Sequence, residues 1–245
     1  MPAAKRVGSA TWWYAKRAEE ADNQGLSAER ITEAALELID AEGLDALSMR
    51  RLADMLDAGA ASIYRHVENK GALLMLVLDA LLGGNELPPH EAVGETWNEQ
   101  ARLLALAYRA SLLRHPRAVP LLIEGQLLGP NALAGREWGL SLFRKAGFSP
   151  ALTATAYLTL VHYVAGYVLQ EVSQHFRSET ERASLRDLFV SLPVATYPTI
   201  VELADDMAKI DTEGEFEFGL DALLAGITEQ FEAESSSLVG KQRGA

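Results

Sequence analysis

The sequence predicts an all-α protein, and three observations support this prediction. Apolar residues recur at intervals of three and four along most of the 245 positions. Alternating β-branched runs, which would indicate strands, are absent. Pro116, Pro130 and Gly147 separate the periodic stretches, as expected of helix ends. Hydrophobic residues make up 49% of the chain, so it can bury a sizeable core.

The first helix is expected from Ala28 to about Ala41. Ser27 can cap its N-terminus, and Glu29 lies near the positive end of the helix dipole. The apolar residues of this segment form one stripe, and Gly43 ends the helix.

The next stretch is interpreted as a helix-turn-helix. One helix begins after Ser48, a turn follows at residues 57–59, and a second helix of about seven residues ends near Val67. Asn69 can cap a further helix that continues to residues 83–84. In this motif the first helix braces across the duplex and the second enters the major groove. Here the second helix carries Ser62, Tyr64, Arg65 and His66. The motif therefore predicts DNA binding.

The charge gives only weak support to that prediction. The net charge is -12, whereas affinity for duplex usually depends on basic residues that meet phosphates. Residues 48–70 hold four basic and three acidic residues, a net of +1, and residues 83–245 hold thirteen and twenty-one, a net of -8. Most of the negative charge therefore lies away from the motif.

A second helical domain follows a loop at residues 85–91, which contains Pro88 and Pro89. Helical stretches are expected at about 93–115, 118–127, 131–146, 150–176, 198–209 and 215–234. Residues 177–196 are polar and ambiguous.

Several function classes lack the residues that they need. The chain contains no GxGxxG, P-loop, GxSxG or HExxH motif, so an enzyme is not expected. The five histidines have no metal-binding spacing and there is no cysteine, so we expect no metal, cofactor or thiolate chemistry. No apolar run reaches the ~18 residues of a membrane helix, and the N-terminus lacks the apolar core of a signal peptide. A cytoplasmic protein without a membrane partner is the expectation.

Longer motifs narrow the interpretation. The chain contains RITEAALELIDAEGLDALSMRRLADML and then SIYRHVENKGALL, in the order of a support helix, two motif helices and a linking helix. With these pieces, Ser27–Leu82 resembles the N-terminal domain of TetR-family transcriptional regulators. Trp97, LLRHP at 112–116, KAGFSP at 145–150 and FEFGLDALLAGITEQF at 216–231 look like the tetracycline-repressor branch of that family.

The resemblance implies a domain plan and a function. The plan is an N-terminal extension (1–26), a three-helix helix-turn-helix DNA-binding domain (27–82), a helical ligand-binding and dimerisation domain (92–235) and a flexible tail (236–245). The implied function is that of a ligand-responsive repressor, which leaves a palindromic double-stranded operator when a small-molecule effector binds. The alternative is a helical protein-interaction adaptor without DNA binding, and the negative net charge of the chain would suit that role.

By this resemblance, eight residues occupy positions where DNA contacts are usual: Arg50, Ala60, Ala61, Ser62, Tyr64, Arg65, His66 and Lys70. Arg65 is the best candidate for base readout, through a bidentate pair with guanine, although it could also be a solvated surface charge. Arg51 is expected to pair with a nearby acid, and Ile63 and Val67 to be core. Asp57 departs from the glycine that is usual in the family, but aspartate tolerates the left-handed conformation.

The effector pocket is expected between helices of the second domain, where small molecules commonly bind. Six candidates combine apolar bulk with a polar tip, each with core packing as its alternative role: His115, Gln126, Trp138, His162, Tyr163 and Tyr167. Alignment through Trp97 puts Glu86, Leu104 and Leu122 where the tetracycline repressor holds its magnesium-chelated drug. Leucine in place of the magnesium-coordinating histidine at 122 predicts a largely apolar ligand that needs no metal.

The helices near 150–176 and 215–234 are the expected dimer elements, and the resemblance implies that they form a four-helix bundle across the two-fold axis of a homodimer. Such a dimer reads two half-sites about one helical turn, ~10 bp, apart. The N-terminal extension has two interpretations. Its basic pairs, Lys5-Arg6 and Lys16-Arg17, could follow the minor groove as an arm, or its aromatic run at 12–14 could pack on the domain surface.

Overall fold

The computed structural model describes residues 7–9, 12–13, 26–83, 96–123, 125, 127–175, 179–209 and 211–243. Side chains are described in all of these except 174–183 and 237–243. Across the described ranges all regular structure is helical and there is no strand, which confirms the all-α prediction.

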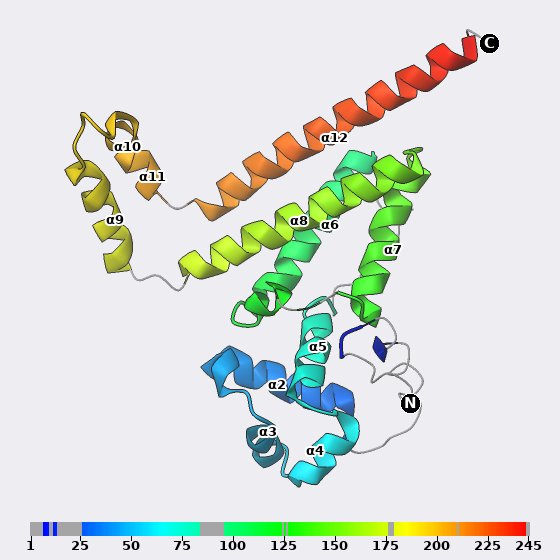
Figure 1. Ribbon diagram of the computed structural model, residues 1–245, viewed down its shortest axis with the longest axis vertical. Helices are drawn as coiled ribbons and strands as arrows, with labels where there is room; N and C mark the ends of the chain where they lie inside the picture. The colour runs from blue at the N-terminus through cyan, green and yellow to red at the C-terminus, as the bar shows by residue number, and fades with distance from the viewer. Residues whose placement is uncertain are drawn as a thin grey trace.

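The N-terminal domain lies at one end of the molecule (Figure 1). Its helices are α2 (Ala28–Glu42), α3 (Met49–Met55), α4 (Ala60–His66) and α5 (Lys70–Ala80), with a short 3-10 helix, η1 (Leu44–Ala46), after α2. The order and the bounds agree with the predicted helices, except that α5 ends slightly before its expected glycines.

The predicted N-caps Ser27 and Asn69 are present in this domain, and Ser48 also caps the helix that follows it. Ser27, Ser48 and Asn69 accept hydrogen bonds from the backbone N–H three residues further on, at 3.3, 3.3 and 2.9 Å. Gly43 ends α2 with a φ of 91°, a conformation that a side chain would disfavour. Ile63 and Val67 are 0% and 1% exposed, which confirms that they belong to the core.

Asp57 forms the turn between α3 and α4 with a φ of 48°, in the left-handed region expected for it. A residue with a Cβ carries roughly 1 kcal/mol of strain there, which aspartate offsets in part by local hydrogen bonding. We therefore expect the free energy of unfolding of Asp57→Ala to be about 1 kcal/mol lower than that of Asp57→Gly. The glycine variant should stay within about 0.5 kcal/mol of the wild type, because the strain that it relieves is offset by the greater flexibility of glycine in the unfolded chain. Urea unfolding measures both, and equal stability of the two variants would contradict the strain.

The second domain is a helical bundle. Its helices are α6 (Trp97–Leu113), α7 (Pro130–Lys145), α8 (Pro150–His175), α9 (Glu179–Ser191), α10 (Pro198–Glu202), α11 (Ala204–Ala208) and α12 (Thr212–Arg243), with a 3-10 helix, η2 (Val119–Ile123), after α6. α8 contacts α6, α7 and α12. α9, α10 and α11 pack on one another and project to one side of the bundle (Figure 1).

Four segments differ from the expected helices. Among the described residues of 118–127, the helical part is the short η2. The ambiguous region 177–196 contains α9, and 198–209 divides into α10 and α11. α12 extends to Arg243, so the backbone over most of the expected flexible tail is helical. By length and composition α8 is long and apolar enough to cross a membrane, as is many a core helix of a soluble protein. Its contacts on three neighbouring helices agree with a place in the bundle.

α5 joins the two domains through Asp79. This aspartate is 6% exposed, and its carboxylate accepts hydrogen bonds from the backbone N–H groups of Asn131 and Ala132 at 3.1 and 3.0 Å. Both N–H groups belong to the first turn of α7, so the carboxylate lies at the positive end of that helix. Gly129, just before α7, leaves no room for a Cβ, which would collide with the same carboxylate. The linking helix is thus fixed to the start of α7.

A second set of contacts joins α2 to the segment after α6. His115 Nδ1 lies 2.6 Å from Asp40 Oδ2, and Arg117 donates to the carbonyl of Ala41 at 2.6 Å. Arg114 donates to the carbonyl of Gly83. A displacement of α6 or α7 therefore acts on the N-terminal domain at more than one point.

Trp12 and Trp13, in the N-terminal extension, are 3% and 5% exposed and join the hydrophobic core. Their rings meet edge to face at 4.8 Å. This burial agrees with the interpretation in which the aromatic residues pack on the domain. Tyr14 and the basic pairs of the proposed arm lie outside the described residues.

Candidate functional site

The residues predicted to contact DNA lie on consecutive helices of the N-terminal domain, α3, α4 and the start of α5. We call this set the reading surface and define it as Arg50, Ala60, Ala61, Ser62, Tyr64, Arg65, His66 and Lys70. Six of the eight are exposed, and Ser62 and His66 are half-buried. α3 and α4 are at the end of the molecule away from the helical bundle (Figure 1).

The geometry of α4 explains why these side chains point outward. Ile63 faces the core, so Tyr64 and Arg65 fall on the opposite side of a short helix, and Tyr64 is 50% exposed. Arg65 Nη2 donates to Ser62 Oγ at 2.8 Å, which holds the guanidinium along the helix. Arg51 pairs with Glu42, which confirms that it has an acidic partner as expected. Its role therefore differs from that predicted for Arg50.

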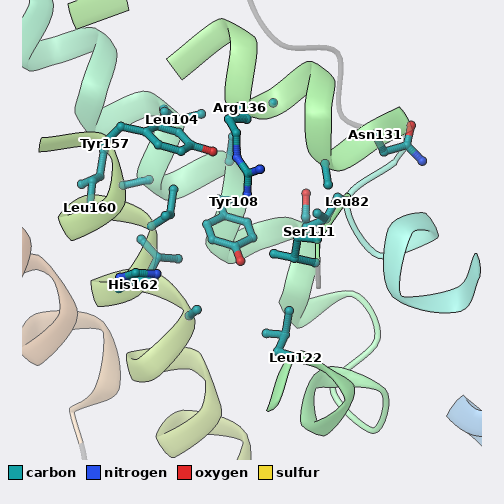
Figure 2. Close-up of a pocket in the computed structure, with 18 of the residues that line it drawn as sticks. Leu82, Leu104, Tyr108, Ser111, Leu122, Asn131, Arg136, Tyr157, Leu160 and His162 are labelled. Carbon is teal, nitrogen blue, oxygen red and sulfur yellow. The ribbon is translucent and has the colours of Figure 1, made fainter. Parts of the chain in front are cut away.

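A cavity of about 630 Å³ lies in the second domain, between α6, α7 and α8 (Figure 2). Most of its lining is apolar: Leu82, Leu104, Ala105, Ala107, Leu122, Leu127, Leu128, Ala132, Ala134, Leu158, Leu160, Val161, Val164 and Ala165. The polar lining consists of Tyr108, Ser111, Asn131, Arg136, Tyr157 and His162. A volume of this size is in the range of small-molecule sites.

Two tyrosines in the lining remain protonated at neutral pH. Burial raises the pKa of Tyr108, and the neighbouring Tyr157 raises it further. Burial also raises the pKa of Tyr157, although the positive charge of Arg136 acts in the opposite direction. Both phenols are therefore hydrogen-bond donors inside the cavity.

Of the five predicted ligand residues that the structure describes, only His162 lines the cavity. The hydroxyls of Tyr163 and Tyr167 donate to the carbonyls of Phe216 and Thr212, both at 2.7 Å, so these tyrosines hold α12 against α8. His115 lies at the domain junction with Asp40. Trp138 is half-buried against the core and is not part of the lining. Gln126 lies outside the described residues.

Sequence reasoning missed most of the polar lining, although helical spacing contained a signal for it. On α6, Leu104, Tyr108 and Ser111 are spaced at four and three, so they share one face. Ala132 and Arg136 repeat the spacing on α7. A search for polar residues in otherwise apolar stripes would have found Tyr108 and Arg136.

The lining bears directly on the ligand chemistry expected from the resemblance. Leu104 and Leu122, at two of the three positions aligned with the magnesium-drug site, both line the cavity, and Glu86 lies outside the described residues. Across the described part of the chain, no group of three His, Cys, Asp or Glu residues is placed to hold a metal ion.

α8 and α12 each carry an exposed stripe of small and apolar residues. On α8 it includes Leu158 and Gly166, and on α12 it includes Phe218, Ala222, Ala225 and Gly226. Phe218 is 78% exposed, and a Cβ at Gly166 or Gly226 would meet open space. Gly219 differs, because it packs closely on Tyr163 within the chain. Both helices thus present surfaces that another protein chain could cover.

Comparisons with known proteins match both domains. Residues 31–76 match the family described as "Bacterial regulatory proteins, tetR family", and residues 89–231 match "Tetracyclin repressor-like, C-terminal domain". The HTH-type transcriptional repressor DrrR1 of Streptomyces coeruleorubidus is 32% identical over 227 residues, which cover 88% of this chain and 82% of that protein. The tetracycline repressor protein class E of Escherichia coli is 28% identical, over 84% of this chain and 93% of the repressor.

A solved structure also matches. ActR, a TetR family protein of Streptomyces coelicolor determined in complex with actinorhodin, superposes with a TM-score of 0.76 and 35% identity. The match covers 84% of this chain and 99% of that one.

Proposed function

Because this chain belongs to the TetR family of transcriptional regulators, we propose that it is a ligand-responsive repressor that a small, largely apolar effector releases from DNA. The observation that carries the proposal is the connection between its two sites: α5 links the reading surface to α7, which lines the cavity. The named relatives are transcriptional regulators rather than enzymes, and one of them was solved with a small molecule bound. We accordingly assign the chain no catalytic role and place it in the cytoplasm.

The protein acts as a homodimer on double-stranded DNA. The exposed stripes of α8 and α12 pair with those of a second copy and form a four-helix bundle. The two reading surfaces then face successive major grooves of a palindromic operator, about one helical turn apart. Arg65 reads a base edge, while Arg50 and Lys70 hold phosphates.

Release follows from the attachment of α5. An effector between α6, α7 and α8 displaces the start of α7, and Asp79 transmits this displacement to α5. A changed angle of α5 alters the separation of the two reading surfaces, so operator and effector weaken each other reciprocally. Couplings of this kind are typically ~1–3 kcal/mol, or about 5–150-fold in affinity.

The test of DNA binding is a selection of bound fragments from the genome that encodes the chain, followed by gel shifts with the recovered sequence. We expect a complex that resists unrelated competitor DNA and weakens as salt rises, because phosphate contacts release counterions. Failure to recover any sequence-selective complex would favour the adaptor without a DNA role.

Magnesium-chelated tetracycline should bind poorly. Leu104 and Leu122 give the chelate no ligands in the cavity, and among the described residues no three His, Cys, Asp or Glu side chains are grouped to hold a metal ion. Calorimetric titration with tetracycline and Mg²⁺ should therefore give no tight complex, and EDTA should not change the response to the true effector. A nanomolar complex that EDTA abolishes would overturn the assignment of a metal-independent ligand.

A further inference from the structure

The cavity contains one feature that an apolar ligand alone does not explain, the cation of Arg136. This residue lies in the middle of α7, is half-buried and belongs to the lining. Figure 2 shows its side chain reaching from α7 toward the hydroxyl of Tyr157 and the ring of Tyr108. The charged group thus lies beside two phenols in a cavity whose lining is mostly apolar.

A guanidinium in such surroundings favours an anion beside it. Removing a charge from water is unfavourable unless an opposite charge or several hydrogen bonds compensate. Among the described residues, no carboxylate lies within 4.0 Å of Arg136, whereas Arg109 elsewhere in the bundle pairs with Glu171 at 2.6 Å. Glu137, its neighbour in the chain, is exposed. The described side chains therefore give the Arg136 guanidinium no carboxylate partner within this distance.

The neighbouring polar groups also suit an anion. Tyr157 lies beside Arg136, and both Tyr157 and Tyr108 are phenols that stay protonated, so they can donate hydrogen bonds. A planar guanidinium with adjacent hydroxyl donors matches the oxygen atoms of a carboxylate, sulfonate or enolate. Apart from Ser111, Asn131 and His162, the rest of the lining is apolar and accommodates a hydrocarbon or ring system.

We infer that the effector is an apolar compound with an acidic group, and that Arg136, with Tyr157 and Tyr108 beside it, binds the anion of that group. This inference rests on the proposed function and makes its effector class more specific. Neutral compounds of the same shape are then poor ligands.

The test uses two fluorescent probes that differ by one group. 1-Anilinonaphthalene-8-sulfonate carries an anionic sulfonate, and N-phenyl-1-naphthylamine has the same rings without it. We expect the wild type to bind the sulfonate more tightly than the amine. Arg136→Met, which keeps an unbranched apolar stem like the aliphatic part of arginine and removes the charged guanidinium, should weaken binding of the sulfonate about 10–100-fold and leave binding of the amine within about twofold.

Two further variants locate the effect. Lys145→Met removes an exposed cation from the end of the same helix and should change neither affinity. Gly135 lines the cavity and a Cβ there meets open space, so Gly135→Phe should exclude both probes. Equal loss of both probes in Arg136→Met, or no loss of the sulfonate, would overturn the role of Arg136. Gel shifts of the wild type and the variants without probe test DNA binding separately. A wild type that forms no operator complex contradicts the proposed function, and it does not bear on the role of Arg136.

Discussion

Replacing Tyr64 and Arg65 together with alanine is expected to lower the affinity for the operator about 100-fold. Both side chains are exposed on α4, opposite the buried Ile63, so their removal leaves the core intact. A bidentate arginine–guanine pair contributes roughly 1–3 kcal/mol of discrimination, and about 3 kcal/mol for both residues corresponds to the expected loss. Gel shifts with operator and with unrelated DNA measure affinity and specificity.

The pattern of loss is as informative as its size. Binding to unrelated DNA should change much less than operator binding, because base contacts supply specificity and phosphate contacts supply most of the non-specific affinity. Lys70→Ala should instead weaken both kinds of DNA by a similar factor. Lys209→Ala removes an exposed charge far from the reading surface and serves as the control. If the double variant still prefers the operator by the wild-type factor, α4 is not the recognition helix.

The sequence was sufficient for the N-terminal domain because the determinants there are local. Ser27, Ser48 and Asn69 each cap the helix that follows them, and each capping bond spans three residues. The buried positions of Ile63 and Val67 also follow from a single helical period. Such features need no knowledge of distant parts of the chain.

The effector cavity was less predictable because its residues come together only in the tertiary structure. Tyr163 and Tyr167 are tyrosines on an apolar helix, as Tyr157 is. Their hydroxyls nevertheless donate to carbonyls of α12, 53 and 45 residues further along the chain. His115 likewise meets Asp40, 75 residues away. Residue type alone does not distinguish a phenol that faces a cavity from one that fastens two helices.

Asp79→Ala is expected to lower the stability of the protein by about 3 kcal/mol and to uncouple effector from operator. The variant leaves the backbone N–H groups of Asn131 and Ala132 without the carboxylate that now accepts from them. Hydrogen bonds to a charged group contribute roughly 1.5–3 kcal/mol each, and the helix dipole adds to this. In a domain of this size the melting temperature should fall by about 5–10 °C.

The uncoupling distinguishes Asp79 from an ordinary structural residue. A saturating effector, identified by screening for operator release, should still bind the variant but weaken its operator complex far less than the 5–150-fold typical of such couplings. Gly129→Ala should reproduce the defect independently, because its Cβ would displace the same carboxylate.

Two further variants serve as controls. Asp79→Asn retains one acceptor, so its coupling should be intermediate. Asp187→Ala removes an exposed carboxylate on α9 and should behave as the wild type. A destabilised Asp79→Ala protein that releases its operator normally would show that the signal reaches the N-terminal domain by another route. The contacts of His115 and Arg117 with α2 offer one such route.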